Sequence, residues 1–294
     1  MKLFGEEFKL RTHYCRYFNT EPELIENPYI NLYVRFYGCN ATCQFCEYHS
    51  DCSKEFDEDK LIEIIKELTS KLFIKKLNIT GGEPTLNYER FLRVFNICKE
   101  HLSDKTMIVV NTNGYNFEKL IKEKEIIKRV TNISLSRHHY DDNKNNEILG
   151  FQSVSYKTIK KAQKKLKPGV LNLTCNLIKG YIDSTDEVYK YLEFASKIGV
   201  DLVGLVSLMK INDYCHDNFI DFNTIDLISK RFNLTKQFSY KDCCKCNNYV
   251  YIPENLKLVR VYHKNTYRPN KIIEGNFSFD GQKLTVGFTD EVII

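Results

Sequence analysis

The sequence "YGCNATCQFCEY" at residues 37–48 places three cysteines, Cys39, Cys43 and Cys46, in one short loop after a predicted strand. The gaps between them are three and two residues, and the residues around them are largely polar. Isolated cysteines often serve as small core side chains, but a polar loop does not favour that role. Tetrahedral zinc normally takes four ligands. Three thiolates with a fourth place left open fit an iron–sulfur cluster better, with one iron free for another ligand.

Predicted strands and helices alternate on both sides of this loop. Five further strands are expected after the first, which covers 30–38, and they occupy 74–80, 106–112, 130–136, 169–178 and 200–209. Amphipathic helices are expected between them at 57–72, 87–102, 116–127, 155–166 and 184–199. Strands that are apolar throughout indicate a parallel sheet covered by helices. The fold class is therefore α/β, a partial (β/α)6 barrel of the TIM type, and its chemistry is expected at the carboxyl ends of the strands.

The chain divides into three predicted parts. Residues 1–29 form an N-terminal extension, residues 30–210 the partial barrel, and residues 211–294 a small β-rich module. Two hairpins are expected in this module, at 249–263 and 276–288, each with a turn sequence between two strands. The module also contains a second group of cysteines: Cys215, Cys243, Cys244 and Cys246.

Composition limits the function classes. The chain has 294 residues, with 43% hydrophobic and 28% charged residues, as in an ordinary globular protein. No run of eighteen apolar residues predicts a membrane span, and the acids in "MKLFGEEFKL" do not suit a signal peptide. A cytoplasmic, reducing location is expected, where clustered thiols bind metal more often than they form disulfides. The net charge of +5 is compatible with a phosphate-bearing substrate but is too diffuse to indicate nucleic acid.

The cysteine spacing, with an aromatic residue before the last cysteine, resembles the signature of the radical S-adenosylmethionine (SAM) enzymes. "NITGGEPTL" at 78–86 resembles the Gly-Gly-Glu-Pro motif of that family, and "NTNG" at 111–114 resembles its turn after the third strand. "NISLSRHHYD" at 132–141 and "LIKGYID" at 177–183 resemble the segments after the fourth and fifth strands. The resemblance covers about residues 30–210. It implies a [4Fe–4S] cluster, SAM as cofactor, and flavodoxin or ferredoxin as electron donor.

The resemblance also implies roles for residues at the strand ends. Three thiolates would hold three irons, and the amino and carboxylate groups of SAM would chelate the fourth. One electron then cleaves SAM to methionine and a 5′-deoxyadenosyl radical, which abstracts hydrogen from the substrate. Gly81 and Gly82 would let the backbone approach SAM, and Glu83 would fix the loop. Further contacts to SAM are expected from Asn111, Asn113, Ser136, Arg137 and Asn176.

The sequence "RHH" predicts a polar lip at the mouth of the barrel. Arg137, His138 and His139 could bind a phosphate or carboxylate of the substrate, or act as acid and base. The competing interpretation is a solvated loop without a catalytic role.

The second cysteine group resembles the twitch modules that many radical SAM proteins append, and a second [4Fe–4S] cluster is expected there. The molybdenum-cofactor GTP cyclases are similar in length and order. Their third auxiliary cysteine lies across a hairpin, but "KLVRVYH" at 257–263 has none, so Cys215 is the candidate to complete the ligand set. Zinc held by the same thiols is the alternative, followed by a reactive thiol or structural cysteines. The ending "GFTDEVII" has no Gly-Arg-Gly tail, so the architecture is expected to be shared but not the reaction.

Three functions remain open from the sequence. The first is a radical SAM enzyme acting on a small-molecule or nucleotide-like substrate. The viperin-like group, which acts on nucleotides, also shows C-N-x-x-C-x-x-C. The second is a maturase that modifies a ribosomally made peptide. Such enzymes usually carry an N-terminal recognition domain of about eighty residues, and only 29 residues precede the first predicted strand here. The third is a non-catalytic iron–sulfur or zinc binding protein.

Overall fold

The structure is a computed structural model. It describes residues 2–7, 29–47, 54–227, 234–239, 249–253, 256–257, 260–264, 276–286, 292 and 294.

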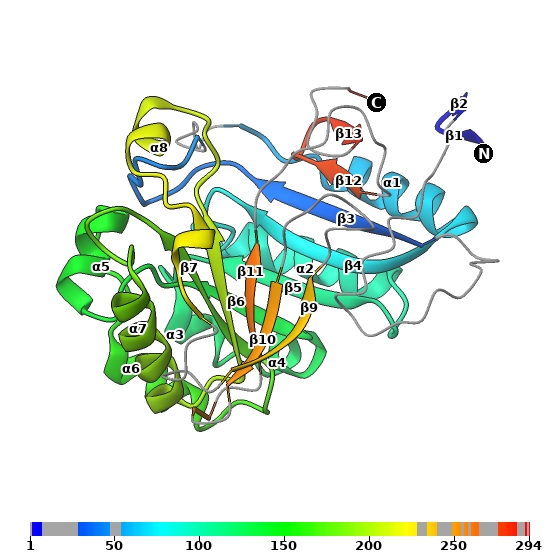
Figure 1. Ribbon diagram of the computed structural model, residues 1–294. Helices are drawn as coiled ribbons and strands as arrows, with labels where there is room; N and C mark the ends of the chain where they lie inside the picture. Colours follow the sequence, from blue (N-terminus) through cyan, green and yellow to red (C-terminus); the bar gives the residue numbers. More distant parts are fainter. Residues whose placement is uncertain are drawn as a thin grey trace.

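Six neighbouring parallel strands form the centre of an 11-stranded sheet (Figure 1). They follow one another in the sheet in the same order as in the sequence, and every neighbouring pair is parallel. Their bounds are β3 (Tyr29–Phe36), β4 (Phe73–Gly81), β5 (Met107–Thr112), β6 (Asn132–Ser136), β7 (Leu171–Leu177) and β8 (Leu202–Ser207). The predicted partial (β/α)6 barrel is confirmed.

Helices connect successive strands, and their boundaries follow the capping residues. Asp57 accepts from the N–H of Lys60 at the start of the first helix, and Ser184 accepts from the N–H of Glu187 at the start of the seventh. The expected helix at 116–127 is two short helices, and one helix after the fourth strand was not predicted. The helices are α1 (Glu58–Lys71), α2 (Tyr88–His101), α3 (Phe117–Leu120), α4 (Lys124–Arg129), α5 (Asp142–Leu149), α6 (Tyr156–Gln163), α7 (Thr185–Ile198) and α8 (Asp213–Asp217).

The two faces of the sheet differ in polarity. On β3, buried apolar residues alternate with half-buried Tyr29, Asn31, Tyr33 and Arg35. The apolar set belongs to the same core cluster as the buried residues of α1 and α2. The expectation of strands that are apolar throughout is therefore wrong for this strand, and β6 and β7 alternate in the same way. We call the face opposite the helices the inner face.

Strands from the C-terminal region extend the same sheet at both edges. β11 (Arg260–Lys264) pairs parallel with β8, and it pairs antiparallel with β10 (Tyr249–Pro253), which continues to β9 (Leu234–Ser239). At the opposite edge β12 (Asn276–Phe279) pairs parallel with β3 and antiparallel with β13 (Leu284–Val286). Both predicted hairpins are present. The division of the chain into a barrel and a separate module stays a prediction.

Two smaller features complete the described chain. β1 (Lys2–Leu3) and β2 (Glu6–Glu7) form a separate two-stranded sheet, and a 3-10 turn covers Phe222–Thr224. Among the described residues, no helix combines the length and apolarity that a membrane crossing requires.

We predict that the β12 edge contributes to the stability of the whole sheet. Phe279 is fully buried and its ring packs edge-on against Phe56 at 5.5 Å. Phe279→Ala should lower the free energy of unfolding by about 3–5 kcal/mol, because it leaves a cavity in the core. Urea denaturation measures this, with Phe73→Ala at a 36% exposed position as the control. Equal effects of the two substitutions would contradict the prediction.

Candidate functional site

The cysteine loop lies directly after β3 and is anchored on α5. The N–H of Thr42 donates to the carbonyl of Leu149 at 2.9 Å, and the thiol of Cys43 faces the same oxygen at 3.9 Å. Gly150 ends α5 with φ of 72°, and a Cβ there would lie 1.9 Å from Oγ1 of Thr42. This contact explains why glycine follows α5. The loop is thus held by a helix that lies about one hundred residues further along the chain.

The three cysteines are free thiols in one loop, a donor set that suits a [4Fe–4S] cluster. Cys43 is buried and Cys39 and Cys46 are half-buried. Burial raises the pKa of Cys43 to about 12 and also raises that of Cys39. Within the described residues, no three His, Cys, Asp or Glu side chains converge on a point where one metal ion could sit. A [4Fe–4S] cluster binds each thiolate through a different iron, so it needs no such convergence.

Gly81 and Gly82 bring the end of β4 against the base of the cysteine loop. The N–H of Gly82 donates to the carbonyl of Phe36, and the N–H of Glu83 to that of Gly38, both at 2.8 Å. A Cβ on Gly81 would lie 2.4 Å from the backbone of Phe36, and one on Gly82 would lie 2.0 Å from the carbonyl oxygen of Gly38. Both positions therefore require glycine for packing alone. Their predicted contact with SAM stays a prediction.

Glu83 is a buried carboxylate that joins the ends of β4 and β5. Its Oε1 accepts from the N–H of Thr85 at 2.9 Å, from the Thr85 hydroxyl at 2.5 Å and from the Thr112 hydroxyl at 2.8 Å. Its Oε2 accepts from the N–H of Asn113 at 2.7 Å. Burial raises the pKa of Glu83, while these hydrogen bonds act in the opposite direction. Glu83 thus links the loops after β4 and β5, and its predicted part in cofactor binding stays a prediction.

Asn113 extends this network to the cysteine loop. Its Oδ1 accepts from the N–H of Tyr115 at 2.9 Å. Its Nδ2 lies 3.0 Å from Oδ1 of Asn40 and 3.6 Å from Sγ of Cys39. The three sequence motifs are thus joined through hydrogen bonds. The sequence offered no signal for the contact with Cys39, because the two residues are 74 positions apart.

The other predicted SAM contacts lie near the carboxyl ends of β5, β6 and β7. Asn111, Ser136 and Asn176 are all half-buried. Asn111 and Ser134 are register partners, as are Ser136 and Thr174, so these residues share the inner face. They lie on three successive strands, and each is two positions out of register with the next.

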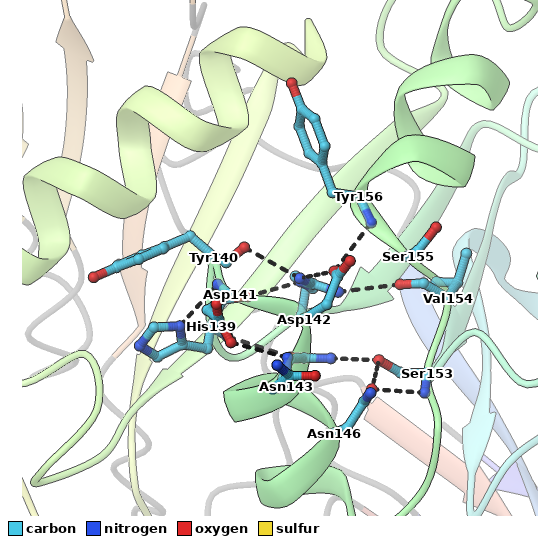
Figure 2. Close-up of polar contacts among 12 residues, drawn as sticks. His139, Tyr140, Asp141, Asp142, Asn143, Asn146, Ser153, Val154, Ser155 and Tyr156 are labelled. Atoms are coloured by element: carbon cyan, nitrogen blue, oxygen red, sulfur yellow. Dashed lines mark hydrogen bonds and ion pairs between the residues drawn. The ribbon is translucent and has the colours of Figure 1, made fainter.

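Arg137 lies inside the fold and not on an exposed lip. It is 1% exposed, and its guanidinium donates to the carbonyls of His139 at 2.7 Å, Val154 at 3.1 Å and Tyr140 at 3.3 Å. It also forms an ion pair with Asp142 at 2.5 Å. Figure 2 shows the surrounding network, in which Asp142 also accepts from the N–H of Tyr156. These contacts hold the segment around α5 together, and none of them points to a role in substrate binding.

His138 and His139 are also buried, with 4% and 0% exposure. Nδ1 of His138 accepts from the N–H of Asn176 at 3.0 Å, and Nδ1 of His139 accepts from that of Asp141 at 2.9 Å. Burial lowers the pKa of His138 to about 3 and that of His139 to about 4, so both rings are neutral at pH 7. Neutral rings cannot serve as cationic phosphate ligands. The catalytic roles of Arg137, His138 and His139 stay predictions without support in these contacts.

Cys215 packs against the first cysteine loop. It lies on α8, is buried, and its Sγ is 3.6 Å from the carbonyl oxygen of Phe45. Asn212 caps α8 by accepting from the N–H of Cys215, and its amide donates to the carbonyl of Gln44 at 3.1 Å. The other predicted ligands of the second site, Cys243, Cys244 and Cys246, lie outside the described residues. The second cluster therefore stays a prediction.

Residues 33–195 match the family model of the radical SAM superfamily. The chain therefore belongs to the radical SAM superfamily, and membership implies SAM and a [4Fe–4S] cluster as cofactors.

The names of the similar proteins indicate more than one activity. A probable GTP 3′,8-cyclase of Pyrococcus horikoshii is 32% identical over 167 residues, which is 56% of this chain and 51% of that protein. A putative glycyl-radical enzyme activating enzyme of Methanocaldococcus jannaschii is 28% identical over 108 residues, which is 37% of this chain and 39% of that protein. The match thus spans about half, or less, of the length of these relatives.

Among solved structures, Streptococcus suis SuiB bound to the precursor peptide SuiA is similar with a TM-score of 0.49. The identity is 19%, and the likeness covers 63% of this chain and 41% of that one.

We predict that Glu83→Gln lowers the free energy of unfolding more than the same substitution of a surface glutamate does. The amide places a donor where donors already converge, and an unsatisfied buried group costs about 1–3 kcal/mol. Urea denaturation of the metal-free protein measures the loss. Glu58→Gln is the matched control, because Glu58 pairs with a half-exposed Arg93 near the surface and should change little. Similar losses in the two variants would refute a special role for Glu83.

We also predict a pH dependence that arises from His138. Its pKa is about 3 in the folded chain and about 6.5 when unfolded. The unfolded chain therefore binds more protons between these values, and stability falls as the pH drops through this window.

The loss from His138 should be about 1.5 kcal/mol between pH 6.5 and pH 5. His138→Asn, which offers an acceptor to the N–H of Asn176, should make the stability of the metal-free protein less dependent on pH in this window. Denaturant titrations at pH 6.5 and 5 measure this, with His101→Asn at a half-buried helix end as control. An unchanged slope in His138→Asn would contradict the assignment.

Proposed function

We propose that this chain is an enzyme that uses SAM and a [4Fe–4S] cluster, held by Cys39, Cys43 and Cys46, to abstract hydrogen from a small, polar, nucleotide-like substrate. When bound, the cofactors supply a one-electron cleavage of SAM to methionine and a 5′-deoxyadenosyl radical, which takes a hydrogen atom from the substrate to give 5′-deoxyadenosine. The electron comes from a flavodoxin or ferredoxin in a reducing, cytoplasmic compartment.

The polarity of the inner face is the observation that carries this proposal. A parallel sheet that is buried on both faces is normally apolar on both. Here the register places Tyr33 beside Asn78 and Ser278, and it places Ser134 beside Asn111 and Asn172. Further polar residues at alternating strand positions are Asn31, Arg35, Thr80, Ser136, Thr174 and Asn176. Such a surface suits a ligand rich in oxygen and nitrogen atoms.

Several buried polar atoms on this face form no hydrogen bond within the described part of the chain. Nδ2 of Asn78, Oδ1 of Asn172 and Oγ of Ser278 are buried and have no hydrogen-bond partner in the described part of the chain. Buried polar groups are almost always hydrogen-bonded in native proteins, because an unmade bond costs free energy. These atoms add to the polarity of the inner face, and a ligand that lies on this face needs donors and acceptors of its own.

The residues near the strand ends have a separate proposed role. We assign Asn111, Ser136 and Asn176 to SAM, because they lie on the inner face near the edge where the cysteine loop begins. Gly81 and Gly82 leave their side of this edge free of side chains. The chain's residues thus bind and orient SAM between the cysteine loop and the polar inner face, where substrate would lie.

The named relatives support a nucleotide-like substrate. Several proteins that match over about half their length are named GTP 3′,8-cyclases. This chain has no cysteine within 257–263, so we propose the substrate class and not that reaction. We also retain the proposal of a second [4Fe–4S] cluster held by the C-terminal cysteines.

We predict that the reconstituted protein releases 5′-deoxyadenosine from SAM under reducing conditions, and that a purine nucleotide accelerates the release. Chromatography of reactions with ATP, GTP, CTP or UTP measures this. The variant with Cys39, Cys43 and Cys46 all changed to Ala should fall to background, whereas Cys98→Ala, in the core on α2, should behave as wild type. Acceleration by a peptide alone would favour the maturase, and no release at all would refute the enzymatic proposal.

Iron analysis of the same samples tests the number of clusters. About eight irons per wild-type chain and about four in the triple variant would support two clusters. About four irons per wild-type chain and none in the triple variant would mean that only the first cluster is present.

A further inference from the structure

We propose that Asn113 is a positioning residue that donates a hydrogen bond to the Cys39 thiolate and raises the reduction potential of the [4Fe–4S] cluster. This inference rests on the proposed function, because it requires that Cys39 be a cluster ligand. It assigns Asn113 to the cluster side of the site.

Two N–H groups point at the sulfur of Cys39. The main-chain N–H of Ala41 lies 3.4 Å from Sγ, and Nδ2 of Asn113 lies 3.6 Å from it. Both separations are within the longer range that sulfur acceptors require. The sulfur of Cys43 faces an acceptor and not a donor, because its neighbour is the carbonyl oxygen of Leu149. Cys39 is therefore placed to accept hydrogen bonds as a thiolate.

The direction of the Asn113 amide is fixed by its neighbours. Oδ1 accepts from the N–H of Tyr115, so the NH2 end must face the cysteine loop. One hydrogen of this group serves Oδ1 of Asn40 at 3.0 Å, and the second is free for Cys39. The main-chain N–H of Asn113 is held by Glu83 at 2.7 Å. Asn113 is 9% exposed, so water competes little for these bonds.

The electrostatic consequence follows from the charge of the cluster. Reduction adds one negative charge, and part of that charge resides on the cysteine sulfurs. A donor dipole aimed at a sulfur stabilises the reduced state more than the oxidised state, which raises the potential. The effect is stronger at a partly buried sulfur, because the local dielectric is low. The carboxylate of Glu83 helps to hold this donor in place through the main-chain N–H of Asn113.

Redox titration of the reconstituted protein without SAM tests this inference. Asn113→Leu removes the donor at similar volume and should shift the midpoint potential to a more negative value. Asn113→Asp keeps an acceptor for Tyr115 and replaces the donor by a carboxylate oxygen, so its negative shift should be larger. Asn132→Leu is the matched control. Asn132 is the first residue of β6, at the end of the strand away from the cysteine loop. Its side chain donates to the main-chain carbonyls of Gly169 and Val170, so its substitution should leave the potential unchanged.

The outcomes separate this inference from the proposed function. If wild type forms no SAM-binding cluster, the proposed function fails. If a cluster forms and both Asn113 variants keep the wild-type potential, only the inference is overturned.

A measurement on wild type covers the case in which the Asn113 variants do not retain iron. Pulsed electron paramagnetic resonance of protein labelled with 15N in asparagine side chains should show a hyperfine coupling from an amide nitrogen to the reduced cluster. Absence of that coupling would overturn the proposal.

Discussion

A buried carboxylate with four donors around it fixes the relation between the strand ends of this barrel. Glu83 can stay in the interior only while Thr85, Thr112 and the N–H of Asn113 remain in place, since a buried charge without donors is very costly. The loops after β4 and β5 are therefore constrained as one unit. Backbone hydrogen bonds from Gly82 and Glu83 add the base of the cysteine loop to that unit. This network of hydrogen bonds within the chain organises the site.

The sheet has an apolar face that stabilises the fold and a polar inner face. The apolar residues of β3, together with Phe277 and Phe279 of β12, lie in the core cluster with the helices. The polar residues contribute little to that core, and several of their buried atoms lack partners in the described residues. This separation permits variation of the inner face without loss of the core. It also explains how one barrel architecture can accept different substrates.

The sequence predicted the features that depend on local spacing. The cysteine gaps and the glycine pair each carry a local signal, and the strand order followed from the β–α alternation. Arg137 was misplaced because its partners are mainly main-chain carbonyls, which every residue possesses and no pattern marks. The contact of Asn113 with Cys39 depends on the register between strands. A hairpin signal likewise says nothing about which edge of a sheet it joins, so the separation of β11 and β12 was not foreseen.

The pairing of β12 with β3 links the order of synthesis to the order of assembly. β3 carries the cysteine loop, whereas its outer neighbour β12 begins at Asn276. During translation that edge of β3 has no partner strand from β12 until the 245 positions that separate Asn31 from Asn276 have been made. A sheet edge in this condition can pair with other chains. Completion of this edge of the strand that carries the cysteine loop is therefore a later step of assembly than formation of β3 itself.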